Sequence, residues 1–198
     1  MEKLIVATQN AGKVREIKEM LRDLGLEVIT MREAGIDIDI EENGTTFEEN
    51  ALIKARAIAE LTDSYVMADD SGLEIDALNK EPGVYSARYL GKDTPYSEKN
   101  QIILDRLSEV ARKERTARFV CAMALVKDGQ DDFVCRGTIE GYIGYEPVGE
   151  NGFGYDPIFY VEELGTSTAN ISLEEKNKIS HRAKALRMVE KELKSRIK

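Results

Sequence analysis

The chain has 198 residues, which is enough for one domain with a full hydrophobic core, or for one domain whose two lobes flank a cleft. Its 28 Lys and Arg residues against 37 Asp and Glu residues give a net charge of −9, so the surface should repel nucleic acids and anionic membranes. We therefore expect a bound anion to be small and held in a local basic pocket.

Targeting and redox signals are weak. The sequence begins MEKLIVAT, without a charged-then-apolar leader, and has no apolar run of the roughly 18 residues that cross a membrane. Cys121 and Cys135 lie in apolar runs and lack the paired spacing of metal ligands. We expect a cytosolic protein with two buried, reduced thiols and no membrane partner.

The first half of the chain alternates strand and helix patterns. Short apolar runs predict strands at residues 4–8, 26–30 and 65–68, the last ending abruptly at Asp69. Helical spacing of apolar residues predicts helices over 14–24, stopped by Gly25, and over 47–61. This alternation indicates an α/β fold whose loops at strand ends form a site.

The second half is richer in β patterns. A helical stretch over 97–111 precedes two β-rich runs, 116–127 and 133–144, which flank the hairpin signal DGQD. From about Ser180 the apolar spacing predicts a closing amphipathic helix. We therefore predict a mixed sheet flanked by helices.

The stretch TQNAGKV, residues 8–14, follows the first predicted strand. It departs from a P-loop, because the first Gly is absent and Val14 stands where a Ser or Thr would hold magnesium. Thr8, Asn10 and Lys13 are still candidates for holding a triphosphate. The alternative is that Lys13 is a solvated lysine in the first turn of a helix.

Carboxylates cluster in two places. Asp69 and Asp70 are adjacent, which raises one pKa unless a cation lies beside them, and oxygen ligands favour Mg²⁺ or Mn²⁺ over zinc. The stretch DIEENGTTFEEN adds the glutamates Glu41, Glu42, Glu48 and Glu49. The last two are also explained as acids favoured by the helix dipole.

Two late stretches have features of a nucleotide site. In ENGFGYDPIF the glycines allow close approach to a flat ligand, Phe153 or Tyr155 can stack on it, and Asp156 can accept from a ring N–H, unless the aromatics only fill the core. In EEKNKISHRAKAL, His181 and Arg182 fall in a first helical turn, where cations are unfavourable without a nearby anion. The alternative is a surface arginine and a hydrogen-bonded histidine.

Five strings in order, over nearly the whole chain, resemble the inosine triphosphate pyrophosphatase family of XTP/dITP diphosphatases. They are ATQNAGK, ENGTTFEENA, ADDSGLEIDAL followed by PGVYSARY, GFGYDPIF and EEKNKISHRA. The resemblance implies an elongated α/β fold with two lobes and an active-site cleft between them, a homodimer, and Mg²⁺-dependent cleavage of purine nucleoside triphosphates (ITP, dITP, XTP) to the monophosphate and pyrophosphate. Deaminated purines would thus be removed from the nucleotide pool.

The resemblance also implies site residues. The triphosphate loop would be Thr8, Gln9, Asn10, Ala11, Gly12 and Lys13. Glu42 and Asp70 would bind magnesium, with the choice between Glu41 and Glu42 left open, and Asp70 would be the catalytic base beside the catalytic Lys13. The nucleotide site would be completed by Ser71, Phe153, Gly154, Tyr155, Asp156, Lys176, His181 and Arg182.

The sequence suggests how the base is selected and also leaves alternative functions open. A donor from His181 or Arg182 at O6 of the base would accept hypoxanthine and reject adenine, whereas the exclusion of guanine is unexplained. One alternative is a Maf-type pyrophosphatase that acts on pyrimidine or modified nucleotides. Another is a nucleotide-binding regulatory module without turnover. A nucleic-acid-binding protein conflicts with the charge of −9.

Overall fold

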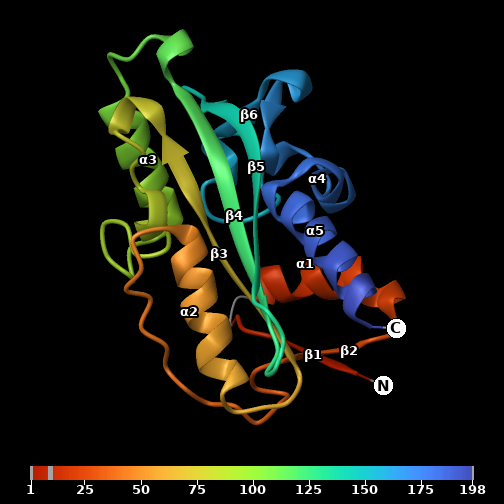
Figure 1. Cartoon of the computed structure of the whole chain (residues 1–198). Coiled ribbons are helices and arrows are strands. Elements are labelled where there is room, and N and C mark those ends of the chain that lie inside the picture. Colours follow the sequence, from red (N-terminus) through yellow and green to blue (C-terminus); the bar gives the residue numbers. More distant parts are fainter. Residues whose placement is uncertain (1, 9–10, 198) are drawn as a thin grey trace. The chain divides into compact units, whose positions relative to one another are not determined.

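The computed structural model describes residues 2–8 and 11–197 and contains one mixed sheet in the order β2-β1-β3-β4-β5-β6-β7 (Figure 1). The strands are β1 (Lys3–Val6), β2 (Glu27–Thr30), β3 (Tyr65–Ile75), β4 (Thr116–Val126), β5 (Phe133–Ile143), β6 (Phe159–Val161) and β7 (Thr166–Ser167). The α-helices are α1 (Ala11–Leu21), α2 (Phe47–Ala59), α3 (Tyr96–Arg106), α4 (Leu173–Ile179) and α5 (His181–Arg196). Strands β2 and β3 run parallel to β1, whereas β6 is antiparallel to β5 and β7. The predicted mixed α/β fold is confirmed.

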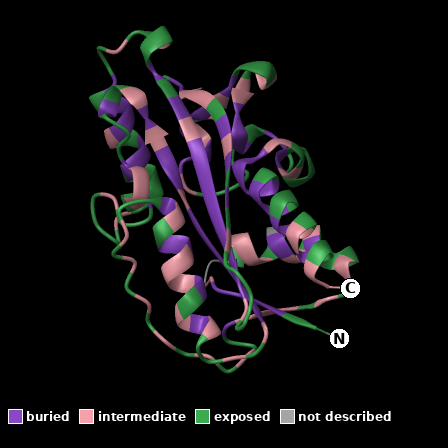
Figure 2. Ribbon diagram, viewed as in Figure 1, coloured by how far each residue is buried: buried purple, intermediate pink, exposed green. Residues whose placement is uncertain are grey.

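The chain forms two compact units. The first takes in Met1–Asp70, Cys121–Gly137 and His181–Lys198, and the second takes in Ser71–Val120 and Thr138–Ser180. Buried residues concentrate on the strands and on one side of each long helix (Figure 2). Within the described residues, no helix is both long and apolar enough to cross a bilayer.

The first unit has helices on both faces of its parallel strands. Alternate residues of β1 and β3, such as Leu4 and Met67, pack in one core cluster with α1 and α5. The residues between them, such as Ile5 and Val66, are equally buried and face the other way, where α2 lies (Figure 1). The chain therefore leaves β1 toward one face of the sheet and leaves β2 toward the other.

The second unit has a separate core. Leu73, Ile103 and Phe159 belong to a cluster formed by β3, α3 and the later strands. Buried Arg115 donates to the carbonyl oxygens of Leu107, at 2.7 Å, and Ile143, at 2.9 Å. The helix predicted over 97–111 ends at Arg106, and Arg115 binds the carbonyl of Leu107 just beyond that end.

Other local predictions can be compared with the structure. Gly25 has a φ of 68° and ends the first helical segment as predicted, because a residue without a Cβ adopts this conformation without strain. Cys121 and Cys135 are free and buried as predicted, and burial raises the pKa of the Cys135 thiol to about 11. The predicted end of the third strand at Ala68 is wrong, since β3 continues to Ile75.

Asp76 in the second unit provides a test of stability against pH. Its carboxylate accepts from both Nη atoms of Arg118, at 3.1 and 3.0 Å, and from Thr116 Oγ1 at 2.6 Å. These bonds, that of Arg118 foremost, hold the pKa of Asp76 well below its usual range. A carboxyl whose pKa is lowered on folding adds stability above its unfolded pKa, and that stability is lost as the pH falls through the folded pKa.

Asp76→Asn should therefore lower the free energy of unfolding by about 1–2 kcal/mol at pH 7, a value discounted for partial exposure. The difference from wild type should shrink below about pH 4. Urea denaturation at both pH values measures it, with the exposed loop variant Asp93→Asn as the control. An equal difference at both pH values would contradict this account.

Candidate active site

Lys13 and Arg182 share one buried carboxylate, that of Asp69. Lys13 lies in the first turn of α1, and its Nζ is 2.7 Å from Asp69 Oδ2. Arg182 Nε, in the first turn of α5, is 4.0 Å from the same oxygen. Burial acts to raise the pKa of Asp69, but the charges of Lys13 and Arg182 outweigh it and hold the pKa well below its usual range. Lys13 is therefore not a solvated lysine, and Arg182 is not a surface arginine.

Asp69 also resolves the expected conflict at the start of α5. Cations in a first helical turn are unfavourable unless an anion lies nearby. The sequence suggested a bound nucleotide for that role, but Asp69 already supplies a negative charge. His181 is buried beside Arg182, and its carbonyl lies close to Gly137 of β5, where a Cβ would come within 2.2 Å of it. Only glycine fits there, so β5 helps to fix the first turn of α5.

Asp70 has different neighbours from Asp69. It accepts a hydrogen bond from Asn50 Nδ2 of α2 at 3.1 Å. Lys54, one turn further along α2, places Nζ 4.0 Å from Asp70 Oδ1 and 3.1 Å from Glu42 Oε2. Burial, with the nearby charge of Glu42, raises the pKa of Asp70 above its ordinary value despite Lys54. Glu42 and Asp70 thus share one cation in this structure.

The strand conformation explains how two adjacent carboxylates are tolerated. Successive side chains of a strand point to opposite faces, so Asp69 reaches the side of α1 and α5, and Asp70 reaches the side of α2. Each carboxylate has its own cation. A metal ion is therefore not needed to explain why Asp69 and Asp70 can be adjacent. With both charges compensated, the strand can continue past Ala68.

The other glutamates around the start of α2 have separate roles. Glu49 and Thr46 form a capping box at the start of α2, and Glu48 is 3.2 Å from Arg136 Nη1. Both therefore lie in the first turn of α2, where the helix dipole favours acids, as the alternative interpretation predicted. Glu41 is exposed, whereas Glu42 is half-buried and contacts Lys54. The geometry favours Glu42 in the choice that the sequence left open.

In the second unit Asp156 is the centre of a buried cluster. Its Oδ2 is 2.7 Å from Lys176 Nζ and accepts from the Phe153 N–H at 2.8 Å, and its Oδ1 accepts from Thr168 Oγ1 at 2.7 Å. These donors hold the carboxylate in place, and Asp156 in turn orients Lys176 and Phe153. Gly152 lies so close that a Cβ would come within 2.2 Å of Asp156 Oδ2.

The two aromatic residues of this loop differ. Tyr155 is buried, donates its hydroxyl to the Ser86 carbonyl at 2.7 Å and packs edge-on against Tyr96. It fills the core, as the alternative interpretation predicted. Phe153 is 39% exposed, and Lys176 Nζ lies 4.9 Å from its ring centroid. Phe153 is therefore the aromatic ring that a flat ligand can reach.

The other predicted positions are less informative. Thr8 and Gly12 are half-buried and Ala11 is exposed around the start of α1, and Ser71 is half-buried in β3. The carbonyl oxygen of Gly154 accepts a hydrogen bond from Asn100 Nδ2 at 3.1 Å. The predicted residues Gln9 and Asn10 lie outside the described residues.

Sequence reasoning missed Asn50 and Lys54. Their spacing of four residues in ENALIK places them on one face of α2, in a segment that otherwise reads as an Ala-rich helix. A polar pair on a face that otherwise packs against the sheet was the available signal. Asp69 was recognised as part of a carboxylate pair, but not as the partner of Lys13.

The chain is similar to known proteins over nearly its whole length. A family model described as the Ham1 family matches residues 4–192. The dITP/XTP pyrophosphatase of Bacillus subtilis is 48% identical over 191 residues, 96% of each chain, and that of Shigella flexneri is 45% identical over the same share. The solved structure of the Staphylococcus aureus Ham1 protein has a TM-score of 0.90 at 40% identity, covering 98% of this chain and 100% of that one. A nucleoside-triphosphatase / dITP/XTP pyrophosphatase from Mycobacterium abscessus has a TM-score of 0.77 at 39% identity, covering 94% and 98%.

The buried pair of Asp156 and Lys176 can be tested by a double-mutant cycle. Asp156→Asn leaves the Lys176 charge buried without its partner and should lower the free energy of unfolding by about 3 kcal/mol or more. Adding Lys176→Met to Asp156→Asn should recover a large part of that loss, because the uncompensated charge is removed. Denaturant unfolding of the four proteins measures the coupling. Strictly additive losses would contradict the proposed pairing.

Proposed function

Because the chain belongs to the Ham1 family, we propose that it is a dITP/XTP pyrophosphatase. In the finer form of the proposal it hydrolyses ITP, dITP and XTP between the α and β phosphates. Water adds to the α phosphorus, the bond to the bridging oxygen breaks, and the products are the nucleoside monophosphate and pyrophosphate. The reaction removes deaminated purines from the nucleotide pool of the cell.

The observation that supports this most directly is the shared cation of Glu42 and Asp70. The Lys54 ammonium lies near both carboxylates, so the pair is already arranged around a positive charge. Within the described residues no group of three or more His, Cys, Asp or Glu side chains forms a metal site. Mg²⁺ fits two carboxylates, since it commonly keeps several waters and binds substrate phosphates as well. We assign Glu42 and Asp70 as its ligands, with Mn²⁺ as a substitute.

The chain's own groups have distinct tasks in this mechanism. Magnesium, when bound, neutralises charge on the phosphate oxygens and lowers the pKa of bound water. Asp70 accepts a proton from the attacking water, and a raised pKa suits a carboxylate for that role. Lys13 and Lys54 supply further positive charge for the triphosphate, and Asp69 holds Lys13 in place. The loop from Thr8 to Lys13 contributes the remaining phosphate contacts.

The purine is recognised by other residues in the proposal. Exposed Phe153 stacks on the base, and His181 or Arg182 donates to O6, which hypoxanthine and xanthine carry and adenine lacks. Lys176 and Ser71 complete the nucleotide contacts. We also propose that the protein is a cytosolic homodimer, as the family resemblance implies.

The first test is chromatography of the products from ITP, dITP and XTP incubated with the protein and Mg²⁺. Parallel reactions use ATP, GTP, UTP and dUTP, with EDTA as the metal control. IMP and pyrophosphate from ITP, with little product from ATP or GTP, is the expected result. Preference for UTP would indicate a Maf-type enzyme, IDP and phosphate would refute the cleaved bond, and no product would favour a binding module.

Asp70→Asn tests the proposed base and metal ligand. It should lower kcat by about 100-fold or more, since the proton acceptor is lost. It should also leave the protein folded and more resistant to heat in EDTA, because an ionised carboxylate that burial disfavours is replaced by a neutral amide. Glu48→Gln, a helix-end change outside the cluster, is the control and should retain activity. Full activity in Asp70→Asn, or in Lys13→Ala, would refute the site.

Lys54→Ala tests whether Glu42 and Asp70 share a cation. Without the Lys54 charge the two carboxylates repel each other, so the melting temperature in EDTA should fall by several degrees, corresponding to about 1–3 kcal/mol. Added Mg²⁺ should raise the melting temperature of Lys54→Ala more than that of wild type. An equal Mg²⁺ effect on both proteins would contradict the shared position.

A further inference from the structure

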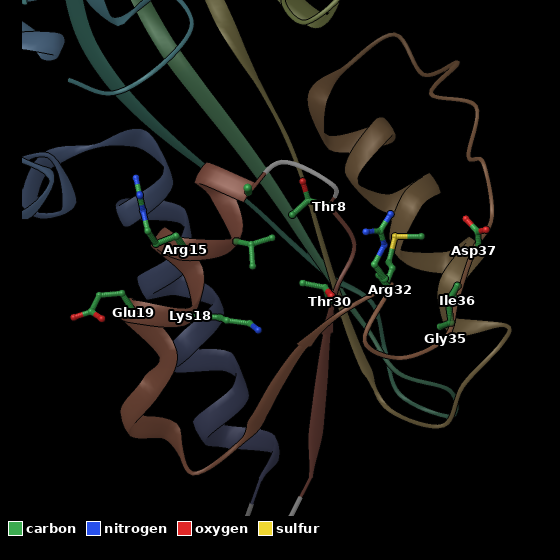
Figure 3. Close-up of a pocket in the computed structure, with 12 residues that line it drawn as sticks. Thr8, Arg15, Lys18, Glu19, Thr30, Arg32, Gly35, Ile36 and Asp37 are labelled. Atoms are coloured by element: carbon green, nitrogen blue, oxygen red, sulfur yellow. The ribbon is translucent and has the colours of Figure 1, made fainter. Parts of the chain in front are cut away.

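A hollow of about 970 Å³ in the first unit is lined mostly by residues that have no role in the proposed reaction (Figure 3). Its walls come from α1 on one side and from the turn and loop after β2 on the other, with Thr8 and Thr30 between them. Its volume is at the upper end of the range of small-molecule sites, roughly 300–1,000 Å³. The hollow is therefore large enough for a nucleotide.

The position of the hollow is one where α/β proteins bind ligands. Thr8 follows β1 and Thr30 ends β2, which are neighbouring parallel strands. The chain leaves β1 toward the face covered by α1 and leaves β2 toward the face covered by α2 (Figure 1). The hollow therefore lies outside the carboxyl ends of two neighbouring parallel strands, which is the end of an open α/β sheet at which ligands bind.

The hollow is separate from the cluster around Lys13. The residues of α1 that line it include Ala11, Val14, Arg15 and Lys18, whose spacings of three and four place them on one face of the helix. Lys13, which contacts Asp69, lies nearly opposite that face at 3.6 residues per turn. Side chains of α1 therefore reach the two places in different directions.

Charge in the hollow matches a phosphate. Among the arginines that the structure describes, Arg15 and Arg32 are the two that have no hydrogen bond, ion pair or ring contact, and both line the hollow. Lys18 lines it too, although it is paired with Glu33 at 3.1 Å. In a chain with a net charge of −9, two unpaired guanidinium groups around one crevice form a local phosphate-binding surface.

The remaining lining matches the rest of a nucleotide. Val14, Met31 and Ile36 offer apolar surface for a base, and Asp37 lies beyond the end of β2. Dinucleotide-binding folds use an acidic residue in the corresponding region to accept a ribose hydroxyl. Glu19 also lines the hollow, but it is paired with Arg22 at 2.8 Å.

We propose that this hollow is a second nucleotide site, which binds a mononucleotide with its phosphate at Arg15 and Arg32 and its ribose at Asp37. Thr8 and Ala11 belong both to this hollow and to the proposed triphosphate loop, so a nucleotide bound here contacts the loop from the side away from Lys13. The proposal does not depend on the hydrolysis reaction, and its test does not use activity.

The test is calorimetric titration of the whole protein with AMP, whose 6-amino group and single phosphate make it a poor match for the proposed substrate site. Four proteins are compared, namely wild type, Lys13→Ala, the double variant Arg15→Gln/Arg32→Gln, and the control Arg56→Gln. Arg56 is an exposed arginine of the same unit that does not line the hollow. Circular dichroism checks that each variant is folded.

AMP should bind wild type, Lys13→Ala and Arg56→Gln alike, and should bind the double variant at least about tenfold more weakly. Asp37→Asn should weaken AMP but leave inorganic phosphate unchanged. Loss of AMP binding in Lys13→Ala with retention in the double variant would assign the nucleotide to the substrate site and overturn the proposal. No binding of AMP to wild type, or equal affinity for AMP and inorganic phosphate, would overturn it as well.

Discussion

The alternation of side chains along β3 is the constraint on which the first unit depends. Asp69 and Asp70 are adjacent in the sequence, and their charges would oppose each other if both pointed the same way. The strand sends them to opposite faces, where Asp69 contacts Lys13 and Arg182, and Asp70 contacts Asn50 and lies near Lys54. Each carboxylate is buried among the cations that it needs.

The same charged contacts position the helices on the sheet. Lys13 and Arg182 stand in the first turns of α1 and α5, so one carboxylate positions the starts of two helices that pack on the same face. Asn50 and Lys54 do the same for α2 on the other face. Burying charges costs several kcal/mol per ion unless each is paired, which explains why the helices and the strand cannot be placed independently.

The second unit also contains a buried aspartate paired with a lysine. Asp156 is buried and accepts from Lys176, Thr168 and the Phe153 N–H, and Gly152 leaves room for its carboxylate. In both units a buried aspartate holds a lysine in one orientation. The difference is that Asp69 has two cations from separate helices, whereas Asp156 has one cation and two neutral donors.

Local patterns in the sequence determined much of this protein. Periodicity located α1, α2, α3, α5 and the strands β1 to β5, because apolar spacing reflects which face is buried, whereas α4, β6 and β7 were not predicted. Gly25 marked a helix end because a residue without a Cβ adopts a positive φ without strain. Five short strings indicated the family and the residue types of the site. The contact of Glu42 with Lys54, and the burial of Tyr155 beside an exposed Phe153, needed the structure, since both depend on which neighbours bury a side chain.

The tertiary structure alone decided the partners of the charges. Lys13 and Asp69 are far apart in the sequence, as are Arg182 and Asp69, and no local pattern pairs them. The continuation of β3 through Asp69 and Asp70 follows from those long-range contacts, which outweigh the local tendency of adjacent carboxylates to end a strand. The sequence by itself determined which groups are present and which segments carry them. Only the fold decided which groups meet, because burial and charge compensation depend on elements that are distant in the chain.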